Sequence, residues 1–245
     1  MSDMPPPLPT DTAILLVAHG SERYADAARP ILTHAAVLRE SGLQVEVGLL
    51  NGEPQAAAAL ACLGAPRITI VPFFMEAGWF TRTAVPRALG LDEEMTKRDG
   101  RSYRYTAPIG THPAMADVIE QRVRRISGDT PNLLLIGHGS ARAPGRVTAL
   151  HDHASRLTAR RRFPRVEVAF LEEAPFAADT LAALRGEPLA VLGFFAGEGA
   201  HVRDDLPALI AAEHAIRATP LVECGTVAEE LGLQRIILDL ATAAA

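Results

Sequence analysis

The eleven residues AILLVAHGSER, at positions 13–23, decide the fold because the chain contains a second copy of them. The segment NLLLIGHGSAR, at positions 132–142, matches them without a gap and is identical at six of the eleven positions. Each copy is an apolar run of strand length that leads into His-Gly-Ser. Because one short match can arise by chance, the same spacing has to recur elsewhere before a duplication is inferred.

Two further pairs of segments repeat in the same order. VEVGLLNGEPQAAAAL from Val45 matches VEVAFLEEAPFAADTL from Val166 at eight of sixteen positions, with an offset of 166 − 45 = 121. FFMEAGWFTRTAVP from Phe73 has its counterpart in FFAGEGAHVRDDLP from Phe194, again with an offset of 121. The histidines of the first pair of segments differ by 119, so two residues were inserted between the first and second matches. We therefore predict a chain made of two duplicated halves.

Short β-branched and leucine-rich runs alternate with helical patterns in each half, which predicts parallel strands joined by crossover helices. The fold class is therefore α/β, with two similar doubly wound parallel sheets of four strands each. The unbroken apolar runs AILLVA and NLLLIG favour strands that are covered on both faces. The expected strands are residues 13–18, 44–50, 67–73, 103–107, 132–136, 166–171, 189–195 and 217–221.

The domain boundaries follow from the repeat and from the turn-forming residues. Residues 1–12 are expected to be a flexible tail, residues 13–128 an N-terminal half with a degenerate site, and residues 129–245 a C-terminal half with the active site. The sequence GDTP, at 128–131, is expected to be the hinge between the halves. Residues 91–104 contain the polar run DEEMTKRDGR and are expected to be a solvated loop.

Composition limits the classes of partner and the compartment. The 245 residues are 48% hydrophobic, and their net charge of −5 provides no broad basic field for nucleic acid. The longest apolar runs are far shorter than the roughly 20 residues that cross a bilayer, and the first residues do not resemble a signal peptide. The two cysteines lack metal-ligand spacing. We therefore expect a cytoplasmic protein that binds neither nucleic acid nor membrane.

Histidines stand at the ends of the first strand of both halves. His19 and His138 lie at the carboxyl edge, where open α/β sheets bind ligands. The neighbouring glycines allow tight turns, and Ser21, Ser140 and the start of the next helix offer hydrogen-bond donors to an anion. Taken alone, each histidine is equally well explained as a residue that caps a turn.

Comparison of the halves makes the C-terminal one the better candidate site. His201 in the third segment corresponds to Phe80, and Glu172 after the second strand corresponds to Asn51. Three successive strand ends of the C-terminal half therefore present two imidazoles and a carboxylate. This set suits a borderline divalent cation and also acid–base chemistry. The adjacent Glu173 is an alternative to Glu172 as the functional carboxylate.

The spacing of the motif residues excludes a serine nucleophile and a nucleotide-binding loop. Neither Gly-Ser pair has the second glycine that a serine nucleophile elbow requires. Neither a P-loop nor a G-x-G-x-x-G fingerprint stands at a strand end. The remaining histidines are expected to face solvent or to cap turns, without matched partners in the other half: His34, His112, His151, His153 and His214.

These motifs together resemble the class II tetrapyrrole chelatases and, within them, the sirohydrochlorin chelatases of the CbiX type. The resemblance spans nearly the whole chain and rests on the strand that enters Gly-His-Gly-Ser, on VEVAFLEEAP, and on the Gly-x-His-x-x-x-Asp-x-Pro pattern of FFAGEGAHVRDDLP. In that family such residues line a cleft between two similar α/β halves. The enzymes insert a divalent metal, cobalt for cobalamin or iron for siroheme, into sirohydrochlorin.

The resemblance implies a lyase whose metal, Co²⁺ or Fe²⁺, is a substrate, without an organic cofactor. It carries the catalytic and metal-ligating roles only to His138, Glu172 and His201, since the N-terminal half lacks the matching glutamate and second histidine. A sirohydrochlorin-type tetrapyrrole is rich in carboxylates and calls for donors and cations. The expected substrate-binding residues are Ser140, Arg142, Arg146, Arg203, His19, Ser21 and Phe80.

Several alternatives stay open at this point. Arg203 can pair with Asp204 or Asp205 instead of substrate. A carrier or regulatory protein that binds metal or tetrapyrrole without insertion is a competing function, and so is a metal-dependent hydrolase with the same ligands. The ligand set accepts Co²⁺, Fe²⁺, Ni²⁺ and Zn²⁺, so Co²⁺ is a working choice; the oligomeric state is left open. Four aromatic residues either form walls against the macrocycle or belong to the core: Phe194, Phe195, Trp79 and Phe80.

Overall fold

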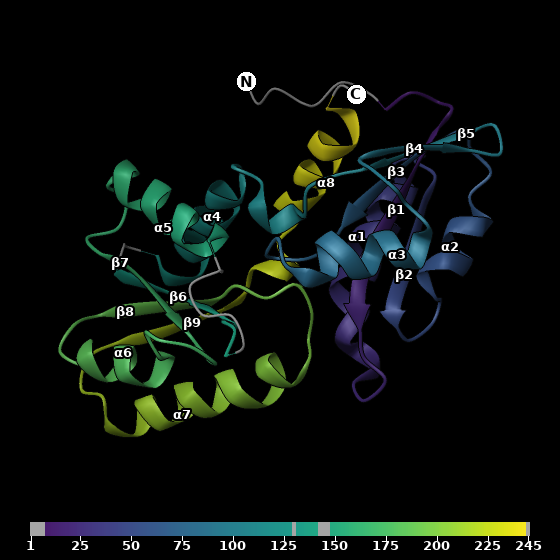
Figure 1. Cartoon of the computed structure of the whole chain (residues 1–245). Helices are drawn as coiled ribbons and strands as arrows, with labels where there is room; N and C mark the ends of the chain where they lie inside the picture. Colours follow the sequence, from purple (N-terminus) through teal and green to yellow (C-terminus); the bar gives the residue numbers. More distant parts are fainter. Residues whose placement is uncertain (1–7, 129–130, 142–147, 244–245) are drawn as a thin grey trace. The chain divides into compact units, whose positions relative to one another are not determined.

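The computed structural model describes residues 8–128, 131–141 and 148–243 of the 245-residue chain. Contacts divide the chain into two compact units: Met1–His112 with Leu231–Ala245 make unit 1, and Pro113–Glu230 make unit 2. Each unit has its own sheet covered by helices (Figure 1). Within the described ranges, no helix is both long and apolar enough to cross a membrane.

The strands of unit 1 are β1 (Thr12–Gly20), β2 (Val45–Asn51), β3 (Arg67–Pro72), β4 (Met95–Arg98) and β5 (Arg101–Tyr105). They form one sheet in the order β2-β1-β3-β5-β4, in which β4 alone runs antiparallel to its neighbour. Strand β1, which lies between β2 and β3, is covered on both faces, as its apolar run predicts, because Ile14, Leu15 and Leu16 are 0% exposed.

The loop predicted for residues 91–104 is wrong, because β4 and β5 form a hairpin there. Asp99 and Gly100 make the turn with φ angles of 52° and 73°. A type I′ hairpin turn requires two consecutive residues with positive φ, and Asp-Gly is one of the pairs that adopt it most readily. The first sheet therefore has five strands instead of the predicted four.

The α-helices described in unit 1 are α1 (Arg29–Glu40), α2 (Ala56–Cys62), α3 (Val85–Leu89) and α8 (Gly232–Thr242), with the short turns η1 (Ala25–Ala28), η2 (Phe80–Ala84) and η3 (Ile109–Thr111). Helix α2 packs with α3, and α1 packs with α8, which Figure 1 shows in yellow near β3. Arg104 on β5 donates to the carbonyls of Leu240 and Ala241, both at 2.7 Å. These bonds satisfy the C-terminal end of α8 and tie it to the sheet.

The strands of unit 2 are β6 (Asn132–Gly137), β7 (Val166–Phe170), β8 (Leu189–Gly193) and β9 (Leu221–Thr226). The α-helices described in this unit are α4 (Met115–Ser127), α5 (Ala149–Arg160), α6 (Ala177–Ala183) and α7 (Leu206–Ile216). Two short helical turns, η4 (His201–Asp205) and η5 (Val227–Glu229), accompany them. The sheet is fully parallel, with four strands in the order β7-β6-β8-β9, as predicted. Figure 1 shows α4 and α5 on one face of this sheet and α6 and α7 on the other. The α/β, doubly wound class is confirmed.

The strand predicted for residues 217–221 is displaced, since β9 begins only at Leu221. Before it, the Arg217 guanidinium turns inward and donates to the carbonyls of Leu181, Leu184 and Glu187 at 2.9–3.1 Å. Two of these carbonyls belong to the end of α6. Arg217, which the apolar pattern assigned to a strand, therefore provides hydrogen-bond donors to the free carbonyls at the end of α6.

The last helix of each sequence half packs in the compact unit that is formed mainly by the other half. Helix α4 precedes the predicted boundary at residue 128 but belongs to unit 2, where Arg122 is 7% exposed and donates to the Cys224 carbonyl at 2.5 Å. Helix α8 ends the C-terminal half but belongs to unit 1. The compact units thus differ from the predicted halves 13–128 and 129–245 by one exchanged helix each. Residues 129–130 of the predicted hinge and 1–7 of the predicted tail lie outside the described residues.

Candidate metal site

The three residues singled out in the C-terminal half lie at neighbouring strand ends of unit 2. His138 directly follows β6, Glu172 follows β7, and His201 begins η4 after β8. The backbone carries the parallel pairing past the strands, because the Glu172 N–H donates to the His138 carbonyl at 3.0 Å. The pairing of β6 with β7 and β8 therefore brings the three side chains to one edge of the sheet.

These side chains are close enough to share one ion. One ligand atom from each of His138, Glu172 and His201 lies within 4.8 Å of the other two. The Glu172 carboxylate approaches His201 Nε2 at 3.6 Å and His138 Nδ1 at 3.8 Å. The two imidazole rings are edge to face, with centroids 4.2 Å apart. Within residues 8–128, 131–141 and 148–243, this is the one group of His, Cys, Asp or Glu side chains that meets this criterion.

Hydrogen bonds determine which imidazole nitrogen is available in each histidine. His138 Nδ1 lies 2.7 Å from the Gly139 carbonyl, and His201 Nδ1 lies 2.6 Å from Asp205 Oδ2. A carbonyl or carboxylate oxygen can only accept, so both Nδ1 atoms carry the proton. The Nε2 atoms of both rings therefore keep the lone pair that a metal requires.

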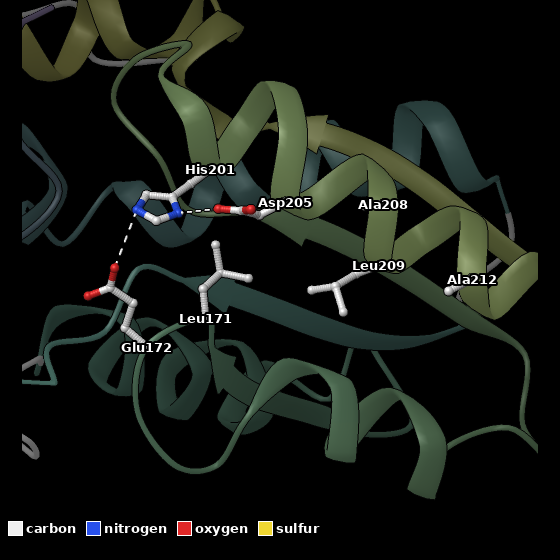
Figure 2. Close-up of a pocket in the computed structure, with 7 residues that line it drawn as sticks. All are labelled: Leu171, Glu172, His201, Asp205, Ala208, Leu209 and Ala212. Carbon is white, nitrogen blue, oxygen red and sulfur yellow. Dashed lines mark hydrogen bonds and ion pairs between the residues drawn. The ribbon is translucent and has the colours of Figure 1, made fainter.

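His201 and Asp205 belong to a π-helical turn that leads into α7. The Leu206 N–H donates to the His201 carbonyl, the i→i+5 bond of a π-helix, a form that is common at functional sites. Figure 2 shows His201, Glu172 and Asp205 at one end of a pocket, with an apolar wall of Leu171, Ala208, Leu209 and Ala212. From the sequence, Asp205 is expected only as a partner for Arg203, although its position four residues after His201 in the motif is a usable signal.

Unit 1 repeats this geometry with different chemistry. The rings of His19 and Phe80 meet edge to face at 4.6 Å and 88°, against 4.2 Å and 88° for the two histidines of unit 2. His19 Nδ1 is 2.8 Å from the Gly20 carbonyl, and Asn51 Nδ2 lies 3.3 Å from His19 Nε2. The Asn51 amide thus donates to the nitrogen lone pair that a metal would need.

The structure separates the two candidate glutamates. Glu172 is exposed and lies in the cluster, whereas Glu173 is 5% exposed and accepts the Ser140 N–H at 3.2 Å. Gly139, between His138 and Ser140, has φ +78°, and a Cβ there would lie 2.9 Å from Glu173 Cγ. Glu173 therefore supports the His-Gly-Ser loop by packing against Gly139 and accepting the Ser140 N–H.

The predicted substrate-binding residues are spread over both units. Ser21 Oγ accepts the Tyr24 N–H at 3.1 Å, which is a local turn contact. Arg203 donates to Glu198 at 3.3 Å, a partner that the sequence did not suggest. Arg142 and Arg146 lie outside the described residues.

The four aromatic candidates divide between core and surface. Phe194 and Phe195 are 3% and 7% exposed, so they belong to the core. Trp79 and Phe80 are 65% and 38% exposed and contact each other with centroids 5.2 Å apart. Phe74 stacks on Phe80 at 6.1 Å, so the exposed rings form one aromatic cluster beside His19.

The expectation that the other histidines lack counterparts is wrong for His34 and His153. They differ by the 119 residues that also separate the site histidines, and each is 1% exposed. Each ring lies against a phenylalanine of the repeated third segment, Phe73 at 5.7 Å and Phe194 at 5.6 Å. They are core residues of both units instead of solvent-facing ones. His112 is half-buried, and burial lowers its pKa.

The family model for CbiX matches this chain twice, over residues 13–126 and again over residues 132–244. A Halobacterium salinarum protein named probable sirohydrochlorin cobaltochelatase is 29% identical over 219 residues, which cover 80% of this chain and 75% of that protein. The sirohydrochlorin cobaltochelatase of Methanothermobacter thermautotrophicus is 32% identical over 130 residues, 45% of this chain and 90% of that protein.

Solved structures share the fold. A multi-domain protein of Deinococcus radiodurans with structural similarity to chelatases superposes with a TM-score of 0.82 and 29% identity, over 94% of this chain and 54% of that one, so this chain spans about half of its length. SirB from Bacillus subtilis with Fe³⁺ superposes with a TM-score of 0.76 at 18% identity, over 94% of this chain and 93% of that one. Since one family model accounts twice for nearly all of the sequence, the duplication is confirmed and the chain belongs to the CbiX family.

Proposed function

We propose that this protein is a sirohydrochlorin chelatase that inserts a divalent metal, Co²⁺ in preference to Fe²⁺, into the tetrapyrrole. The observation that carries the proposal is the cluster of His138, Glu172 and His201 at the carboxyl edge of the unit 2 sheet. The names of the relatives support the substrate and the choice of cobalt, because the Halobacterium and Methanothermobacter proteins are both named cobaltochelatases.

The cluster provides what metal insertion requires. The two imidazoles and one carboxylate hold the incoming cation, and three protein ligands leave coordination positions for pyrrole nitrogens. Insertion exchanges the cation for two pyrrole N–H protons, which leave the macrocycle as H⁺. Glu172 lies within 4 Å of both histidines and is 42% exposed, so it is placed to accept a proton and release it to solvent.

The macrocycle needs contacts of its own. In unit 2, we propose that Ser140 and Arg203 bind its carboxylates, because they follow the site histidines and offer donors. The roles predicted for Arg142 and Arg146, and for the unit 1 residues His19, Ser21 and Phe80, stay predictions.

The proposal is tested by mixing purified protein with sirohydrochlorin and Co²⁺ and following the visible absorption of the macrocycle. The wild type is expected to convert the spectrum to that of the metal complex with turnover, and His201→Ala to abolish this conversion. His214→Ala removes an exposed histidine from α7, the helix that follows η4, and should leave the rate unchanged. A spectrum that shifts stoichiometrically without turnover would indicate a tetrapyrrole carrier and contradict the enzyme. No tetrapyrrole binding at all would contradict both.

A further inference from the structure

We infer that Asp205 is a positioning residue that fixes the tautomer and the orientation of His201. Its carboxylate Oδ2 lies 2.6 Å from His201 Nδ1, a short distance typical of a charge-assisted hydrogen bond. Figure 2 shows the contact on the side of the imidazole that faces away from Glu172. The contact between Asp205 and His201 does not depend on the proposed function, but its effect on metal binding rests on that function.

The need for such a residue follows from the chemistry of imidazole. A neutral histidine has one protonated nitrogen and one lone pair, and only the nitrogen with the lone pair binds a metal. Because the Asp205 carboxylate can only accept a hydrogen bond, it requires the proton on Nδ1. Nε2, which faces Glu172 at 3.6 Å, is then the free ligand. A hydrogen bond of this kind also holds the ring in one orientation.

The two site histidines are held by different means. His138 Nδ1 contacts the backbone carbonyl of Gly139 at 2.7 Å, and the equivalent His19 contacts the carbonyl of Gly20 at 2.8 Å. A backbone carbonyl is present whatever the sequence, so this contact persists in both units. His201 is instead held by a side chain, which substitution can remove.

The internal duplication separates a functional role for Asp205 from a structural one. The residue of unit 1 that corresponds to Asp205 is Ala84, since 205 − 121 = 84. The π-helical turn is present in both units, with the same i→i+5 bond, at Phe80–Ala84 and at His201–Asp205. The turn therefore does not need the carboxylate. In unit 1 the aspartate is absent together with the second histidine that it would orient.

The first test reads the tautomer directly in the metal-free protein. Nitrogen-15 chemical shifts of His201 should report a protonated Nδ1 and an unprotonated Nε2 in the wild type. Asp205→Ala, which installs the residue that unit 1 already tolerates, should give mixed tautomers. Asp204→Ala is the matched control, because it removes the same charge one residue away and should leave the His201 shifts unchanged. Unchanged shifts in Asp205→Ala would overturn the inference, whatever the protein's activity.

The second test measures Co²⁺ affinity in a double-mutant cycle. Asp205→Ala alone should weaken Co²⁺ binding by about 10- to 100-fold, the range for partners that orient metal-ligating histidines. In a His201→Ala background the same change should have no further effect, because the ring that Asp205 orients is gone. An equal loss in both backgrounds would show that Asp205 acts as a ligand or through the fold, and would overturn the positioning role. If wild type binds no Co²⁺ while the tautomer result holds, the proposed function fails and the inference stands.

Discussion

Grafting the unit 2 residues onto unit 1 should create a second metal site in this chain. The triple substitution Asn51→Glu/Phe80→His/Ala84→Asp introduces the unit 1 equivalents of Glu172, His201 and Asp205, while His19 is already present. The ring pair of unit 1 has the same 88° interplanar angle, and its centroid separation differs from that of unit 2 by only 4.6 − 4.2 = 0.4 Å. The backbone of unit 1 therefore already has the geometry that would bring the new ligands together.

The graft should fold. Phe80 is 38% exposed, and its contacts with neighbouring rings are worth about 0.5–1.5 kcal/mol each, part of which an imidazole keeps. That loss is small against the roughly 5–15 kcal/mol by which domains are stable. Replacing Asn51 also removes the amide that donates to His19 Nε2, so the lone pair of His19 becomes available.

Co²⁺ titration under stoichiometric conditions, followed by visible absorption, measures the outcome. Stoichiometry should rise from one to two Co²⁺ per chain, because one cluster is present at the start. In a His138→Ala/His201→Ala background it should rise from none to one. The matched control Asn51→Gln/Phe80→His/Ala84→Asn has the same shapes without the carboxylates and should bind the second ion far more weakly. A folded graft, checked by circular dichroism, that still binds a single Co²⁺ would refute the view that these side chains alone make the site.

Three further outcomes are expected. His138→Ala should abolish metal insertion while His19→Ala retains most of it, since Asn51 already engages the His19 lone pair; equal loss in two folded variants would rule out a site confined to unit 2. Glu173→Ala should lower the free energy of unfolding by about 1–3 kcal/mol in urea titrations, because the Ser140 N–H loses its acceptor; an unchanged urea midpoint would contradict this support role. Burial raises the pKa of Cys224 to about 11, so near pH 8 a thiol reagent should label only the exposed Cys62 until denaturant is added, and immediate double labelling would contradict the buried position.

The repeat alone was enough to predict the parts of the site that depend on strand order. Parallel strands end at a common edge, so the matching segments predict from the sequence alone that His138, Glu172 and His201 lie together. The choice between Glu172 and Glu173 requires the structure. Both residues follow the same strand, and the sequence does not show which of the two side chains lies beside the histidines. Asp205 stands four residues after His201, a spacing that brings side chains together on a helix, but only the structure shows that the helical segment begins at His201.

Other differences between the structure and the sequence predictions also have identifiable physical causes. The polar composition of residues 91–104 predicts a loop, although the Asp99-Gly100 pair within it is a strong hairpin signal. Apolar character near Arg217 suggested a strand, but the guanidinium bonds of that residue cannot be inferred from hydropathy. The sequence signal for the matched burial of His34 and His153 is their offset of 119 residues, the same as that of His19 and His138. The exchange of α4 and α8 depends on contacts more than 100 residues apart, such as Arg104 with Leu240, which patterns within one half do not contain.

The position of α8 has a consequence for the order in which the chain acquires structure during synthesis. Unit 2 is continuous in sequence, so all of its described strands and helices have left the ribosome once Glu230 has emerged. Unit 1 begins first but lacks α8, whose Leu233, Ile236 and Ile237 are 0% exposed in the finished protein. Until these residues emerge, α1 lacks the helix that packs beside it, and the part of the first sheet at β3 lacks the helix that contacts it. Domains usually fold in the order of their synthesis, but here the unit that starts the chain is the last to be completed.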